Sequence, residues 1–285
     1  MNERKNNASP ISNFPDARSL APRVVFFDLD GTLLPMDLDE FMDKYYKLIA
    51  RYVSLHQLDV VGFKRGFEKA VYAMMHHDAR QTNEDAFWEK FMSEAGGTRE
   101  AWESEFMKFY RGDFNLIARD FDPNPRASEV VDVLAGKGYP LVLATTPLFP
   151  RVAVEQRLAW AGLSPQAFVR ITTYENSCSL KPASRYFAEN LAALNVSGAD
   201  VLMVGNNTVE DYAAAKLGCQ VVLCTDFLLN PAHVNMFTIP HGTFDQFADW
   251  AQKLPACNNP AVCAQTGVVD AFQRESALSA NMRMA

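Results

Sequence analysis

Short apolar runs of strand length alternate along most of the chain with stretches whose apolar residues recur at helical spacing. The runs are continuously apolar, which is typical of strands that are covered on both faces of a parallel sheet. They occupy residues 23–27, 141–145, 168–173, 201–204 and 220–224, and helical patterns occupy 128–135, 151–161, 183–194, 206–217 and 244–254. Strands that alternate with helices predict an α/β protein with a doubly wound, Rossmann-like parallel sheet.

Residues 37–121 interrupt this alternation. Four aromatic-rich helical patterns follow one another there without a strand signal; in the first, apolar residues such as Phe41, Tyr45 and Ile49 share one helix face. This texture predicts an all-helical cap domain inserted after the first strand. We expect a flexible leader at 1–20, a core at 21–36 plus 122–254, the cap at 37–121 and a C-terminal tail at 255–285.

Composition and charge narrow the class of protein. Hydrophobic residues make up 48% and charged residues 21% of the chain, which is a globular balance. A net charge of -7, without a dense Lys/Arg cluster, argues against nucleic-acid binding. The apolar runs are much shorter than the roughly 20 residues that cross a bilayer, and the first residues lack a signal-peptide core. We therefore expect a cytoplasmic protein without membrane or nucleic-acid partners, and the five cysteines predict free thiols.

Polar side chains gather where the expected strands end. In an open α/β sheet this edge is where ligands bind. The residues concerned are Asp28 and Asp30 after the first strand, Thr145 and Thr146 after the second, Lys181 beyond the third, and Asn206, Asn207, Glu210 and Asp211 after the fourth. Carboxylates, hydroxyls and a lysine at one sheet edge indicate phosphoryl chemistry on a metal.

Each of the candidate catalytic residues has a chemical reason to be there. The Asp28 carboxylate can attack phosphorus and form an aspartyl phosphate, which divides one difficult step into two. Asp30 can protonate the leaving oxygen and then deprotonate the attacking water, while Gly31 permits the turn between strand and site. Thr145 can donate a hydrogen bond to a phosphoryl oxygen, and Lys181 can neutralise anionic oxygens. A hard divalent cation, Mg²⁺ in our interpretation, would offset the repulsion between Asp28 and phosphate.

The same residues carry a resemblance to a known family. The stretch Asp28-Leu29-Asp30-Gly31-Thr32 resembles the first motif of the haloacid dehalogenase superfamily, in the form that its phosphatases use. Thr145, Lys181 and the stretch 205–211 resemble the second, third and fourth motifs in the same order. The long gap between Asp28 and Thr145 is similar to that of members with a helical cap inserted after the first motif.

The resemblance implies a set of binding residues. Metal ligands would be Asp28, Asp30, Asn206, Asn207 and Asp211, and substrate contacts would be Gly31, Thr32 and Thr146. The family usually has an aspartate at the position of Asn206 or Asn207. An amide binds a metal through its carbonyl oxygen without adding charge, so we expect Mg²⁺ to bind more weakly. Candidate cap contacts are Tyr45, Tyr46, Arg51, Lys64 and Arg65.

These observations favour a Mg²⁺-dependent phosphatase that hydrolyses a small phosphate monoester through an aspartyl phosphate at Asp28. A phosphomutase would use the same motifs. A dehalogenase would keep the nucleophile and need neither the acid Asp30 nor a metal. A non-catalytic protein that binds phosphorylated small molecules at a degenerate metal site is the remaining alternative, and the sequence leaves the oligomeric state open.

Overall fold

A six-stranded parallel sheet forms the centre of the molecule, in a computed structural model that describes residues 12–264. The strand order is β3-β2-β1-β4-β5-β6, so the chain starts in the middle and winds first to one side and then to the other. The strands are β1 (Val24–Phe27), β2 (Leu141–Leu143), β3 (Arg170–Ile171), β4 (Val201–Gly205), β5 (Gln220–Cys224) and β6 (His241–Gly242). The predicted doubly wound α/β sheet is confirmed, with β6 as an additional strand.

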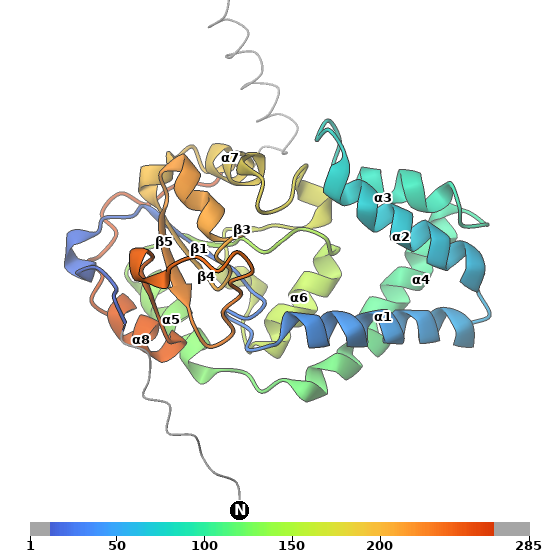
Figure 1. Cartoon of the computed structure of the whole chain (residues 1–285), viewed down its shortest axis with the longest axis horizontal. Helices are drawn as coiled ribbons and strands as arrows, with labels where there is room; N and C mark the ends of the chain where they lie inside the picture. Colours follow the sequence, from blue (N-terminus) through green and yellow to red (C-terminus); the bar gives the residue numbers. More distant parts are fainter. Residues whose placement is uncertain (1–11, 265–285) are drawn as a thin grey trace, which may run out of the picture.

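Helices cover the two faces of the sheet (Figure 1). They are α5 (Pro125–Gly136), α6 (Arg151–Trp160), α7 (Ser184–Ala193) and α8 (Phe244–Ala251). The strands β1 and β4 are completely buried between them, as their continuous apolar sequences require. The stretch after β4 that we expected to be a helix is a turn followed by a 3-10 segment at Tyr212–Leu217. The Asp211 carboxylate accepts hydrogen bonds from the backbone amides of Asn206 and Asn207 and therefore does not cap this segment.

The cap consists of four helices that extend to one side of the sheet (Figure 1). They are α1 (Leu38–Leu55), α2 (Val60–His76), α3 (Asn83–Met92) and α4 (Arg99–Arg111), and the 3-10 segment Asp113–Asp120 follows them. Each helix begins at an Asp or Thr whose side chain accepts a backbone N–H of the first turn, as N-caps do. Phe91, Phe109 and Phe114 are completely buried in this bundle, so its aromatic stripes form a core.

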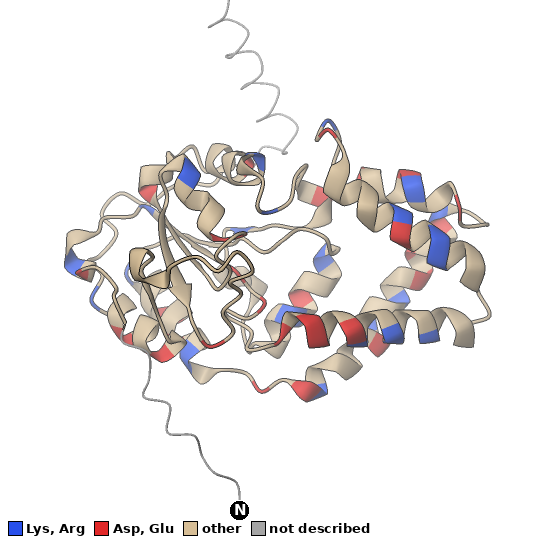
Figure 2. Ribbon diagram, in the orientation of Figure 1, with Lys and Arg blue, Asp and Glu red and all other residues tan. Residues whose placement is uncertain are grey.

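Several sequence-based expectations concern the surface and the ends. Acidic and basic positions are interspersed along the cap helices in Figure 2. Between residues 12 and 264, no helix combines the length and the apolarity that crossing a bilayer demands. All five cysteines are free thiols. The predicted leader and tail fall partly at residues 1–11 and 265–285, outside the described residues.

A close contact between α2 and α3 gives a first prediction. A Cβ atom on Gly66 would lie 2.8 Å from the backbone oxygen of Phe91, which cannot move aside easily. We expect Gly66→Ala to lower the free energy of unfolding by about 1–3 kcal/mol, as overpacking does. Urea unfolding measures this change in the free energy of unfolding. The matched control is Gly136→Ala at the end of α5, where a Cβ meets nothing within 4 Å and stability should not fall. Equal effects at the two positions would show that this contact is not tight.

Candidate active site

A buried lysine connects two carboxylates at the carboxyl ends of β1 and β4. Lys181 Nζ donates to Asp28 Oδ1 at 2.8 Å and to Asp211 Oδ1 at 2.6 Å. The backbone N–H of Asp28 donates to the Val204 carbonyl at 2.9 Å, which continues the pairing of β1 with β4. Residues that are far apart in the sequence therefore meet at one sheet edge, as the motif positions predicted.

Electrostatics in this cluster follow from burial and from the three charges. Burial raises the pKa of Asp28 to about 8; Lys181 opposes the rise, and Asp211 and Asp30 add to it. Burial alone would lower the pKa of Lys181, but Asp211 and Asp28 hold it well above its usual value. Lys181 therefore carries its charge throughout the physiological range and offers it to anionic oxygens beside Asp28.

The turn after β4 is closed by two side chains. Asp211 Oδ2 accepts the backbone N–H groups of Asn206 and Asn207, both at 2.9 Å. Asn207 Oδ1 accepts the N–H groups of Val209 at 2.9 Å and Glu210 at 3.1 Å. Both side chains thus use these oxygens within the chain, where they fix the turn, while the other oxygen of Asp211 accepts from Lys181.

Asn206 lies against the turn that follows β1. Its Nδ2 donates to the Phe227 carbonyl at 2.7 Å, and its Oδ1 accepts from Thr32 Oγ1 at 3.4 Å. Gly31 has a φ of +79°, and a Cβ there would lie 2.3 Å from Asn206 Nδ2. Glycine is therefore required at this position both for the turn and for the approach of Asn206.

The two threonines after β2 are held by different partners. The carbonyl of Thr145 accepts hydrogen bonds from Thr172 Oγ1 at 2.6 Å and from the Tyr186 hydroxyl at 3.0 Å. Thr146 Oγ1 donates to Glu210 Oε2 at 2.8 Å. The turns after β2 and β4 are thereby joined to each other through side chains.

Arg157 is a site residue that the motif analysis missed. It lies on α6, is 1% exposed, and forms an ion pair with Asp30 through Nη1. Its guanidinium carbon lies 4.5 Å from the Phe149 ring centre and 5.7 Å from that of Phe41. The only sequence signal is its position on the helix, four residues after Ala153, which is also buried.

Three buried polar atoms at this ion pair have no hydrogen-bond partner within the described residues. They are Asp30 Oδ1, Arg157 Nε and Arg157 Nη2. Buried polar groups normally have partners, so such atoms mark a place for a ligand, an ion or water. Asp30 thus presents one oxygen to Arg157 and keeps the other available.

The remaining oxygen atoms fit a hard cation. Residues 12–264 contain no group of three or more His, Cys, Asp and Glu side chains placed to hold a metal ion. The carboxylate of Asp28, after β1, and the amide oxygen of Asn206, after the neighbouring β4, are nevertheless oxygen atoms of the kind that a hard cation prefers. Mg²⁺ is commonly held by one or two carboxylates together with water and substrate oxygens, so these atoms suit it.

Comparison with known proteins shows the family to which the chain belongs. The family model of the haloacid dehalogenase-like hydrolases matches residues 22–218, and the chain belongs to this family of hydrolases. The search of curated proteins gave no match.

Solved structures that are similar to this chain include a dehalogenase and two phosphatases. A 2-haloacid dehalogenase from Pseudomonas syringae is 16% identical, covers 80% of this chain and 97% of its own, and gives a TM-score of 0.52. A HAD phosphatase from Thermococcus onnurineus is 17% identical, covers 80% of this chain and 96% of its own, and gives a TM-score of 0.48. A predicted phosphoglycolate phosphatase from Haemophilus somnus is 18% identical, covers 80% of this chain and 97% of its own, and gives a TM-score of 0.47. At 16% identity, the similarity to the dehalogenase concerns the fold alone.

Proposed function

We propose that this hydrolase is a phosphatase that cleaves a small phosphate monoester through an aspartyl phosphate at Asp28. The observation that carries the proposal is the pairing of Asp28 with the buried Lys181 while a second carboxylate, Asp30, keeps one oxygen unpartnered. A nucleophile and a separate acid–base group are what phosphate ester hydrolysis in two steps requires.

The side chains divide the reaction between them. Asp28 attacks phosphorus with the oxygen that is not bonded to Lys181, and the bond from phosphorus to the ester oxygen breaks. Asp30 gives a proton to that leaving oxygen and takes one from the water that later attacks the phosphoryl group, which restores Asp28. Lys181, oriented by Asp211, holds positive charge next to the phosphoryl oxygens throughout. Thr145 and Thr146 lie at the same sheet edge and are the proposed hydroxyl contacts, together with Gly31 and Thr32.

We propose that the Asp28 oxygen that does not attack, the backbone carbonyl of Asp30 and the amide oxygen of Asn206 would hold Mg²⁺, whose charge would offset the repulsion between phosphate and the carboxylates. The Asp30 carboxyl oxygen that is not paired with Arg157 is then left for proton transfer. Replacing Asn206 with Asp adds a negative charge to this donor set, so we expect Mg²⁺ to bind about tenfold more tightly. The measurement is the Mg²⁺ concentration that gives half-maximal activity, together with calorimetric titration of the metal.

Asn207→Asp is the matched control for this variant. The Asn207 oxygen caps the amides of Val209 and Glu210, and an aspartate can keep those bonds without reaching the cation. A gain in affinity that is equal in the two variants, or larger in Asn207→Asp, would contradict the assignment of Asn206 as the ligand.

Dehalogenation is a second candidate function because of the ion pair between Asp30 and Arg157. A carboxylate tied to a buried guanidinium is less available for proton transfer, and Asn206 adds no charge for a metal. In this alternative Asp28 displaces a halide from carbon, and water then cleaves the ester, with no acid and no metal required.

Product assays separate the two candidates. We expect p-nitrophenyl phosphate to be hydrolysed in a Mg²⁺-dependent reaction, and 2-chloropropionate to release no chloride. Chloride release without phosphatase activity would replace the phosphatase proposal with the dehalogenase.

A further inference from the structure

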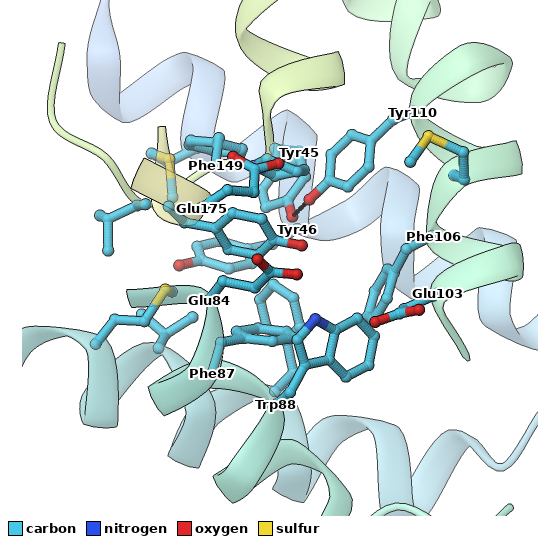
Figure 3. A pocket seen from close by; sticks show the side chains of 18 residues that line it. Tyr45, Tyr46, Glu84, Phe87, Trp88, Glu103, Phe106, Tyr110, Phe149 and Glu175 are labelled. Carbon is cyan, nitrogen blue, oxygen red and sulfur yellow. Dashed lines mark hydrogen bonds between the residues drawn. The ribbon is translucent and has the colours of Figure 1, made fainter. Parts of the chain in front are cut away.

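A cavity of about 260 Å³ lies between the cap and the segments of the core that face it. Helices α1, α2, α3 and α4 and the loops after β2 and β3 contribute to its walls. Its surface is largely aromatic and includes Tyr45, Tyr46, Phe87, Phe106, Phe149 and Tyr174 (Figure 3). The face of an aromatic ring is electronegative and attracts a cation.

Three carboxylates lie among these rings in Figure 3. They belong to Glu84, Glu103 and Glu175, and no Lys, Arg or His is among the described residues that line the cavity. Arg99, behind the wall, pairs with both Glu84 and Glu103. Three carboxylates and one guanidinium leave two negative charges in excess, which favours a cationic ligand over an anionic one.

Glu175 provides an independent sign of a missing partner. Its Oε1 accepts the backbone N–H of Arg151 at 2.8 Å, whereas its Oε2 is buried without a hydrogen-bond partner in the described part of the chain. Burial raises the pKa of the neighbouring Glu84, with a further contribution from Glu175, and Arg99 opposes both. The buried Glu175 Oε2 and the partly buried Glu84 therefore place negative charge at the cavity wall, which a cation would offset.

Only a few residues of the chain separate the end of β2, at the phosphoryl site, from the wall of the cavity. Thr145 and Thr146 are at the end of β2, and Phe149, only a few residues further, lines the cavity. Four residues span at most about 14 Å when fully extended. Arg157 contacts the ring of Phe149 and is itself neutralised by Asp30. A substrate that places one group at Asp28 and another in the cavity would therefore have to span a distance of this order.

We propose that this cavity binds an ammonium group, so that the substrate carries a phosphate ester at one end and a quaternary or protonated amine at the other. The assignment of the phosphate end rests on the proposed function, whereas the ammonium site stands on the rings and carboxylates alone. In this assignment the rings surround the cation, and Glu175 and Glu84 supply the opposite charge.

The test compares choline with 3,3-dimethylbutan-1-ol, which has the same shape with carbon in place of the charged nitrogen. We expect choline to bind at least about tenfold more tightly in a ligand-observed NMR titration at constant ionic strength. Glu175→Gln should weaken choline binding about tenfold and leave the binding of the neutral alcohol unchanged. Glu155→Gln is the control, because Glu155 is outside the cavity and pairs with Arg151.

Equal or tighter binding of the neutral alcohol, or no saturable binding of choline, would overturn the ammonium site. Asp28→Asn should bind choline like the unchanged protein, so failure of phosphatase activity does not affect this result. In the complementary assay, phosphocholine should exceed 3,3-dimethylbutyl phosphate in kcat/KM by about tenfold or more. Phosphatase activity that makes no distinction between these two esters would leave the proposed function intact and overturn the proposal that the substrate carries an amine.

Discussion

Asp28→Asn is expected to lower kcat for phosphate ester hydrolysis by about 10⁴-fold or more, because the amide cannot serve as the nucleophile. The change is close to isosteric, and Lys181 keeps its second partner, Asp211, so the fold should be retained. The measurement is phosphate release under saturating Mg²⁺, with circular dichroism as the test of folding.

An exposed aspartate provides the control for this variant. Asp16 forms an exposed ion pair with Arg18 at the surface, and Asp16→Asn should keep full activity. A folded Asp28→Asn protein with undiminished turnover would mean that another group attacks phosphorus.

Arg157→Met is expected to cause the largest loss of stability, about 3–5 kcal/mol in the free energy of unfolding. Arg157 is almost completely buried and Asp30 is mostly buried, so removing the guanidinium leaves a carboxylate without its counter-charge. Methionine fills much of the same volume and can still pack against Phe41 and Phe149, which makes the loss mainly electrostatic. Urea unfolding with a constant m-value is the measurement.

The double variant Asp30→Asn/Arg157→Met tests the cause. Asp30→Asn removes the carboxylate that Arg157→Met leaves without a counter-charge. We therefore expect the double variant to recover most of the stability that Arg157→Met loses. Arg151→Met is the surface control; Arg151 forms an exposed pair with Glu155, and its loss should cost less than about 1 kcal/mol. A similar loss for Arg151→Met and Arg157→Met, or no recovery in the double variant, would contradict the importance of the buried pair.

The sequence predicted the sheet, and the edge of the sheet at which Asp28 and Lys181 lie, for a physical reason. A strand buried on both faces has to be continuously apolar, and its polar residues can only follow its end. Asp28 and Lys181 could therefore be placed at one edge before their contact was known, and the structure places Lys181 Nζ 2.8 Å from Asp28. Gly31 was likewise identified from the turn, and its φ is positive.

Long-range pairing was not predictable in the same way. Arg157 meets Asp30 across 127 positions of sequence, and only the packing of α6 against the cap and sheet brings them together. Of the candidate cap contacts, Tyr45 and Tyr46 line the cavity, whereas Arg51, Lys64 and Arg65 are exposed and are not part of its wall. Helical spacing identifies a face, but which residues of that face border a cavity depends on how the helices are arranged.

The most direct test of the central claim is the mass of the protein during turnover of p-nitrophenyl phosphate, quenched in acid and digested. The proposed mechanism predicts that the peptide containing Asp28 gains the mass of one phosphoryl group, and that this adduct disappears when the substrate is exhausted. Steady phosphate release with an unmodified Asp28 peptide, or the adduct on a different residue, would contradict covalent catalysis at Asp28.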